Sequence, residues 1–229
     1  MKNILIIGGS SGIGLALVDL LSQEHQVFVA SRTSERLTGK NCTHLPFDAA
    51  TDTLDASVLP ELHGFVYCPG SINLRPFKGL KPETFQADFE LNVLGAVKAL
   101  QAVGKNLGAS GQASVVFYST VAVQTGMPFH ASVAAAKGAL EGLTRSLAAE
   151  WAPKIRVNCI APSLVNTPLA DKFLNNEAKM EKASERHPMQ RVGTPQEIAE
   201  ATAFLLSDKS GWMTGQVLTI DGGIGTLKT

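Results

Sequence analysis

The sequence predicts an α/β fold: a three-layer, doubly wound parallel sheet of about seven strands with helices on both faces. Short apolar runs alternate with helical patterns along all 229 residues. The runs lack the polar alternation of a half-exposed strand, which indicates strands buried on both faces. Strand–helix repetition of this kind favours parallel pairing. No repeat or low-complexity linker interrupts the chain, so residues 1–229 are predicted to form one domain.

Seven runs are the predicted strands, and four longer segments carry helical periodicity. The strands are Asn3–Ile7, Gln26–Ala30, His44–Phe47, Phe65–Tyr67, Ala113–Ser119, Ile155–Ile160 and Gln216–Ile220. The helices are Ile13–Ser22, Pro82–Gly104, Ala131–Trp151 and Pro195–Leu206. Pro82 and Thr194 stand where a helix start favours a proline or a hydroxyl cap.

The composition narrows the classes of partner. The 20 basic and 20 acidic residues give a formal net charge of zero. That balance offers no electrostatic reason to expect nucleic acid or an anionic membrane. Cys42, Cys68 and Cys159 lie far apart, which argues against a disulfide framework and a metal site. We find no targeting signal and no apolar run of membrane-spanning length, and therefore expect a soluble, cytoplasmic protein.

A glycine-rich segment, Gly8-Gly9-Ser10-Ser11-Gly12-Ile13-Gly14, joins the first predicted strand to the first helix. Glycine there allows a tight turn and a close approach of the backbone to a pyrophosphate. The free N–H groups at the helix N-terminus then bind the phosphate charge. The alternative is a structural turn without a ligand, which the strand–loop–helix context disfavours.

The GxxxGxG spacing of this loop resembles that of the short-chain dehydrogenase/reductase family. The resemblance continues at Asn92 in Leu91–Gly95, at Arg156–Pro162 and at Thr219–Gly223. It implies a Rossmann-type fold and a nicotinamide cofactor. The implied cofactor-binding residues are Gly8, Ser10, Ser11, Gly12, Ile13, Gly14, Ser31, Arg32, Asp48, Cys68, Pro69, Gly70, Asn92, Lys137, Pro162, Ser163, Val165 and Thr167. Among them, Val165 and Thr167 match positions that contact the carboxamide.

The end of the second strand bears on the choice of cofactor. An acidic residue there would accept hydrogen bonds from the adenosine ribose. Ser31-Arg32 occupies the place instead, so a guanidinium is available for a 2′-phosphate. We expect NADP(H) in preference to NAD(H), the alternative being that Arg32 is a solvated surface charge. Asp48 resembles a family acid near the adenine, or it only caps the following turn.

The catalytic pattern departs from the family. Lys137 matches the lysine of the YxxxK pair, but Val133 stands where the tyrosine belongs, and valine cannot transfer a proton. Thr120 occupies the serine position and keeps a hydroxyl donor. Cys68-Pro69-Gly70 replaces the family's Asn-Ala-Gly motif. These changes argue against ordinary ketone and alcohol chemistry.

Three residues are candidates for the missing acid. His130 precedes Lys137 by seven residues, two helical turns, where enoyl-thioester reductases of a divergent subgroup place their tyrosine. The alternative for His130 is a solvent-facing residue at the helix start. Tyr118 shares strand parity with Thr120, although a packed aromatic is the favoured interpretation. Ser132 ranks last, because its hydroxyl is a poor acid.

Residues 168–191, here called the flap, are predicted to cover the substrate, as the resemblance implies. Asp171–Arg191 has the charge pattern of a solvated helix with mixed signs, which indicates no anionic substrate. The apolar members of the flap imply a mostly apolar ligand pocket, the alternative being plain packing. They are Leu169, Phe173, Leu174 and Met180, with Met189 as a further candidate. The helices at 83–104 and 131–151 pair between subunits in the family, so we expect a homodimer or homotetramer.

The sequence thus predicts an NADP(H)-dependent oxidoreductase that moves hydride to or from a small, mostly apolar carbonyl or enoyl substrate. Lys137 would bind the nicotinamide ribose and Thr120 the substrate oxygen. Asn92 would support a water or backbone link to the lysine, and His130 would be the acid. No metal is expected. One alternative is a non-catalytic NADP(H)-binding sensor or scaffold; another is a dehydrating or epimerising enzyme on the same fold.

Overall fold

One parallel sheet of seven strands, in the order β3-β2-β1-β4-β5-β6-β7, organises residues 1–228, which are the residues that the computed structural model describes. The strands are β1 (Asn3–Ile7), β2 (Gln26–Ser31), β3 (Cys42–Pro46), β4 (Gly64–Tyr67), β5 (Ala113–Tyr118), β6 (Ile155–Pro162) and β7 (Val217–Ile220). The order reverses between β1 and β4, so a crevice opens beyond the carboxyl ends of these strands. The predicted doubly wound sheet is confirmed.

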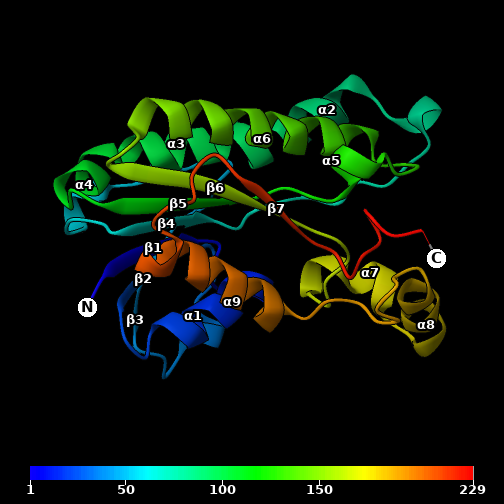
Figure 1. The fold of residues 1–229 in the computed structure, drawn as a ribbon, viewed down its shortest axis with the longest axis horizontal. Helices are drawn as coiled ribbons and strands as arrows, with labels where there is room; N and C mark the ends of the chain where they lie inside the picture. The colour runs from blue at the N-terminus through cyan, green and yellow to red at the C-terminus, as the bar shows by residue number, and fades with distance from the viewer. Residues whose placement is uncertain (229) are drawn as a thin grey trace.

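Helices cover both faces of the sheet (Figure 1). One face carries α1 (Gly12–Leu21) and α9 (Pro195–Leu206), and the other carries α2 (Pro82–Phe89), α3 (Gly95–Ala102) and α6 (Ala131–Trp151). The shorter helices are α4 (Gly104–Ala109), α5 (Ala122–Thr125), α7 (Asp171–Leu174) and α8 (Glu177–Glu185). Five 3₁₀ turns cover Glu35–Leu37, Ala56–Val58, Phe77–Gly79, Pro168–Ala170 and Asp208–Ser210. The flap therefore contains α7 and α8, which lie beyond the end of the sheet in Figure 1.

Each face of the sheet has its own apolar core. Along β1, Leu5 and Ile7 pack toward α3 and α6, whereas Ile4 and Ile6 pack toward α1 and α9. All four side chains are at most 1% exposed. Burial on both faces explains why this strand shows no polar alternation in the sequence.

The predicted helix at Pro82–Gly104 is wrong as a continuous α-helix. The α2 helix ends at Phe89, a π-helical turn follows over Glu90–Leu94, and α3 begins at Gly95. At this interruption the buried Tyr67 hydroxyl donates a 2.6 Å hydrogen bond to the Leu91 carbonyl. A Cβ on Gly95 would lie 2.4 Å from that hydroxyl, so only glycine fits there. Such π-turns are frequent at functional sites, and this one carries Asn92.

None of the helices within residues 1–228 combines the length and the apolar character that crossing a membrane requires.

Candidate active site

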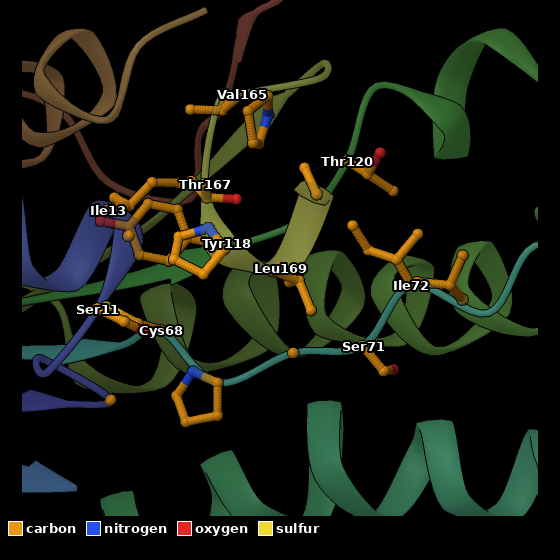
Figure 2. A pocket seen from close by; sticks show the side chains of 18 of the residues that line it. Ser11, Ile13, Cys68, Ser71, Ile72, Tyr118, Thr120, Val165, Thr167 and Leu169 are labelled. Atoms are coloured by element: carbon orange, nitrogen blue, oxygen red, sulfur yellow. The ribbon is translucent and has the colours of Figure 1, made fainter. Parts of the chain in front are cut away.

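A cavity of about 1220 Å³ lies at the carboxyl ends of the strands, where the sheet order reverses (Figure 2). Its wall combines the glycine loop, the ends of β2, β4, β5 and β6, the start of α6, and the flap. Every residue that the resemblance implies as cofactor-binding lines this cavity except Asn92, which is fully buried behind Gly70. Thr120, His130, Val133 and Lys137 line it as well. The topology therefore gathers the predicted site in one place.

The glycine loop is built by close backbone packing. A Cβ on Gly14 would lie 2.4 Å from the carbonyl oxygen of Gly8, a distance that no side chain tolerates. Ser11 precedes α1 in an extended conformation and makes no side-chain capping bond to the helix. The first-turn N–H groups of α1 are thus free to bind a phosphate, and the loop fits a dinucleotide.

The predicted adenosine end contains Ser31, Arg32 and Asp48. Ser31 ends β2 with its hydroxyl donating to the Thr33 carbonyl at 2.8 Å. Arg32 is exposed and borders the cavity. Asp48 also borders it, while its Oδ1 accepts a 2.9 Å hydrogen bond from the Ala50 N–H. Asp48 therefore caps a turn and faces the cavity at the same time.

Lys137 lies at the centre of the cavity wall, on the inner face of α6. Its side chain is 7% exposed, and burial lowers the pKa of its ammonium from 10.5 to about 8, although Cys159, Cys68 and Asp88 act in the opposite direction. A Cβ on Gly70 would lie 3.3 Å from Lys137 Nζ and 3.2 Å from Asn92 Oδ1. Gly70 thus leaves room for the lysine ammonium and the amide oxygen to face the same space.

A chain of hydrogen bonds fixes how the Asn92 amide is turned. The buried Asp88 carboxylate accepts from the Ser71 hydroxyl at 2.6 Å and from Asn73 Nδ2 at 2.7 Å. Because Ser71 donates to Asp88, it accepts from Asn92 Nδ2, at 2.9 Å. The NH₂ group of Asn92 also donates to the Asp88 backbone carbonyl at 2.8 Å. Its Oδ1 is left facing Gly70 and Lys137, with no partner among residues 1–228.

Few of the side chains near Lys137 can act as proton donors. Val133 is 5% exposed and presents an apolar wall one turn before Lys137. Thr120 Oγ1 accepts a 3.3 Å hydrogen bond from the Ala122 N–H, which leaves its own hydrogen available for a substrate oxygen. Figure 2 shows Thr120 on the same side of the pocket as Ile72, away from Ser11 of the glycine loop.

His130 stands immediately before α6 and borders the cavity. Its Nδ1 lies 2.7 Å from the Pro128 carbonyl oxygen, which is an acceptor only, so Nδ1 carries the hydrogen. In the neutral ring Nε2 is then an acceptor. His130 can give a proton from Nε2 only as the imidazolium.

Of the remaining two acid candidates, Tyr118 lines the cavity and Ser132 does not. Tyr118 ends β5, and its hydroxyl makes a 2.7 Å hydrogen bond with Thr202 Oγ1 of α9, on the opposite face of the sheet from α6. Thr120 lies beyond the end of β5, so the strand parity with Tyr118 does not apply. Tyr118 thus packs on the α9 face of the sheet, as a core aromatic would, and also borders the cavity. Ser132 is 1% exposed and does not line the cavity.

Sequence reasoning missed two groups of side chains. Ser163 Oγ donates to His187 Nε2 at 2.9 Å, while His187 Nδ1 donates to the Ala183 carbonyl at 2.8 Å, so the end of β6 is tied to the flap. Asp88 and Ser71 were the other omission. Asp88 precedes Asn92 by four residues, one helical turn, and that spacing of two polar residues was the available signal. No comparable spacing marks His187.

The parallel sheet, the glycine loop at its switch point and the central lysine define a nicotinamide-type oxidoreductase fold. A family model described as Enoyl-(Acyl carrier protein) reductase matches residues 8–225. The chain belongs to the short-chain dehydrogenase/reductase family of oxidoreductases.

One relative spans nearly the whole chain and another about two thirds of it. A tropinone reductase homolog from Arabidopsis thaliana is 32% identical, over 97% of this chain and 91% of its own length. The peroxisomal 2,4-dienoyl-CoA reductase SPS19 of Saccharomyces cerevisiae is 36% identical over 67% of this chain and 52% of its own.

Solved structures agree with the fold. A short-chain dehydrogenase family protein from Francisella tularensis superposes with a TM-score of 0.89 at 30% identity, covering 99% of this chain and all of the other. A gluconate 5-dehydrogenase from Burkholderia cenocepacia, in complex with NADP and tartrate, gives a TM-score of 0.90 at 26% identity. There the coverage is 99% of this chain and 96% of the other.

Proposed function

We propose that the protein is an NADP(H)-dependent oxidoreductase that transfers hydride to or from a small, mostly apolar carbonyl or enoyl substrate with an atypical proton donor. One observation carries the proposal. The buried ammonium of Lys137 and the Thr120 hydroxyl border the same cavity as the glycine loop, whereas the wall one turn before the lysine is the apolar side chain of Val133.

Arg32 supports the choice of NADP(H). It is exposed at the end of β2 and borders the cavity, and no carboxylate stands beside it in Ser31-Arg32-Thr33 to repel a 2′-phosphate. The structural relative from Burkholderia cenocepacia binds NADP, which agrees with this choice.

Each of the chain's own residues would have a separate role in the reaction. A bound nicotinamide supplies or accepts the hydride. Thr120 donates a hydrogen bond to the substrate oxygen, and Lys137 adds positive potential beside it. Asn92 Oδ1 faces the lysine across Gly70 and supports a water link to its ammonium. Half of that ammonium is deprotonated at a pH of about 8. His130, at the start of α6, donates a proton when its ring is protonated.

Enoyl reduction suits this site better than ketone reduction. Hydride addition to a β-carbon produces an enolate, whose oxygen needs hydrogen-bond donors and whose carbon can take its proton from water. Thr120 and Lys137 provide donors without a tyrosine. The names of the matching family model and of the dienoyl-CoA reductase relative agree with this substrate class.

Titration with NADPH and, separately, NADH tests the cofactor choice through nicotinamide fluorescence. We expect NADPH to bind at least tenfold more tightly, because Arg32 pairs with the extra phosphate. The Arg32→Gln variant should remove most of that preference. Equal binding of the two by the wild type would contradict the role of Arg32.

A Val133→Tyr variant tests the reaction class, with Val133→Phe as the control for size. Wild-type protein should oxidise NADPH with enoyl thioesters or enones and not with simple ketones. Ketone reduction that appears only in Val133→Tyr would show that the native site lacks that chemistry. A wild type that reduces ketones but no enoyl substrate would overturn the proposal. Unchanged turnover in His130→Ala would remove His130 from the mechanism.

The second candidate is a non-catalytic NADP(H)-binding sensor. Val133 and the Cys68-Pro69 replacement favour it, since both remove family groups beside Lys137. NADPH binding without turnover of any enoyl or carbonyl substrate would establish this alternative. We also propose a homodimer or homotetramer through α2–α3 and α6, where Phe89 and Leu94 are exposed. Light scattering on the purified protein tests that assembly.

A further inference from the structure

The wall of the cavity is strongly cationic, although the whole chain is neutral. Six lysine and arginine residues border the cavity, and Asp48 is the one carboxylate that does so within residues 1–228. The six are Arg32, Lys137, Lys172, Lys179, Lys182 and Arg186. Arg32 and Lys137 are explained by the proposed cofactor, whereas the four cations of the flap are not.

The flap separates its charges by face. Lys179, Lys182 and Arg186 follow an i, i+3, i+7 spacing and border the cavity together. The acidic residues of the flap do not border it; they are Asp171, Glu177, Glu181 and Glu185. The charges of the flap are mixed along the sequence, but only the basic ones border the cavity.

Within the described chain, no carboxylate pairs with any of the four flap cations. Lys172 Nζ instead donates to the Ile72 carbonyl at 2.6 Å, reaching from the flap to the opposite wall. Lys179 Nζ donates to the Lys172 carbonyl and to Asn175 Oδ1, both at 2.9 Å. The cationic face is therefore not neutralised by the flap's own acids.

Only part of the predicted apolar surface of the flap borders the cavity. Leu169 and Phe173 border the cavity, as expected for a ligand with an apolar portion. Leu174 and Met180 do not; they pack with Ala183 into a small core that holds the flap together. The predicted apolar cover is thus half wrong. Before α8 the flap borders the cavity with Leu169, Lys172 and Phe173, and from α8 onward its charged lining is Lys179, Lys182 and Arg186.

We propose that the substrate carries a phosphate-bearing anionic handle, which Lys179, Lys182 and Arg186 bind while the reacting carbon lies at Thr120 and Lys137. This inference rests on the proposed function and specifies its substrate class. From Lys179 to Arg186 the helix rises about 10 Å, a span that suits several phosphates better than one carboxylate. An acyl thioester of coenzyme A has both parts, an apolar acyl group and a polyanionic carrier.

The test compares two thioesters of one acyl group, crotonyl-coenzyme A and the neutral S-crotonyl-N-acetylcysteamine. The wild type should use the coenzyme A ester with a kcat/KM at least about tenfold higher, and added salt should reduce that advantage. A Lys182→Gln, Arg186→Gln double variant should lose most of the ratio. Glu181→Gln, on the other face of α8, is the matched control and should keep it.

A binding measurement separates this inference from the proposed function. Calorimetry with coenzyme A itself, on the protein saturated with NADP⁺, should show binding that the double variant weakens at least about fivefold. Should neither thioester be reduced, the proposed function fails, and the coenzyme A titration still decides this inference.

Three results would overturn it. Equal kcat/KM for the two thioesters would mean that no anionic handle is recognised. Weaker NADPH binding by the double variant, with coenzyme A binding unchanged, would assign the cations to the cofactor's phosphates. Competition by glutarate but not by inorganic pyrophosphate would assign them to a carboxylate substrate.

Discussion

The two halves of the cavity are built in different ways. The glycine-loop half, at the ends of β1 and β2, is formed by backbone packed so closely that Gly14 admits no side chain. The substrate half, between α6, the π-turn and the flap, is formed by side chains, and several of those differ from the family pattern. A site formed by backbone can be recognised in the sequence from the spacing of its glycines. A site formed by side chains can be recognised only from its residue types.

The difference has a physical basis in how each half would tolerate change. Any side chain at position 14 would collide with the Gly8 carbonyl, so the loop requires glycine there. Val133, by contrast, packs at 5% exposure on a continuous α6, at the position where the family resemblance leads us to expect tyrosine. The cofactor half is therefore held by stability as well as function, while the substrate half is free to change its chemistry.

The largest expected effect is that of Gly14→Ala. The added methyl group meets backbone at 2.4 Å, so the loop or α1 must shift. We expect NADPH binding to be lost in a fluorescence titration and the free energy of unfolding to fall by about 2 kcal/mol.

Gly142→Ala is the control for that substitution. Gly142 is exposed on α6 with nothing within 4 Å of an added Cβ, so alanine should stabilise the helix by up to about 1 kcal/mol. Normal NADPH binding by Gly14→Ala would show that the glycine loop is a structural turn and would break the comparison between the halves.

Lys137→Met comes next in size and acts on the substrate half. The variant keeps a side chain of similar length without the charge, and kcat/KM should fall about 100-fold. In the wild type, burial lowers the lysine pKa to about 8, so the ammonium is present below that pH and lost above it. The kcat/KM profile should accordingly decline above a pH of about 8, and the variant should lack that decline. A decline that persists in Lys137→Met would belong to another group.

The fold and the cofactor half could be predicted from the sequence, because apolar runs, a glycine spacing and strand ends report backbone placement. The sheet order and the gathering of Ser31, Arg32 and Thr167 at one cavity follow from that topology. The π-turn could not be predicted, since the hydroxyl that bonds to its Leu91 carbonyl belongs to Tyr67 on β4, 24 residues earlier in the chain. The separation of charges on the flap could have been predicted from the helical spacing of Lys179, Lys182 and Arg186.

Asp88→Asn should have a smaller effect, on the position of the pH profile rather than on its height. The Asp88 charge raises the Lys137 pKa and its carboxylate turns the Asn92 amide so that Oδ1 faces the lysine. Without the charge the lysine pKa falls further, so the decline of kcat/KM should begin about half a pH unit lower. Glu83→Gln, an exposed change on the same helix, should leave the profile in place. An unmoved profile in Asp88→Asn would separate Asp88 from the lysine.

Tyr118→Phe should have the smallest effect. It tests the comparison between the two halves of the cavity at a residue that packs on the α9 face of the sheet. The change removes the buried hydrogen bond to Thr202, so the free energy of unfolding, measured in urea, should fall by about 1 kcal/mol. Turnover should stay within twofold of the wild type, because the hydroxyl is hydrogen-bonded to Thr202 of α9. A tenfold loss of turnover at unchanged stability would instead make Tyr118 the proton donor. In that case the substrate half would have kept a phenol after all, delivered from the other side of the sheet, and Val133 would mark a relocated acid.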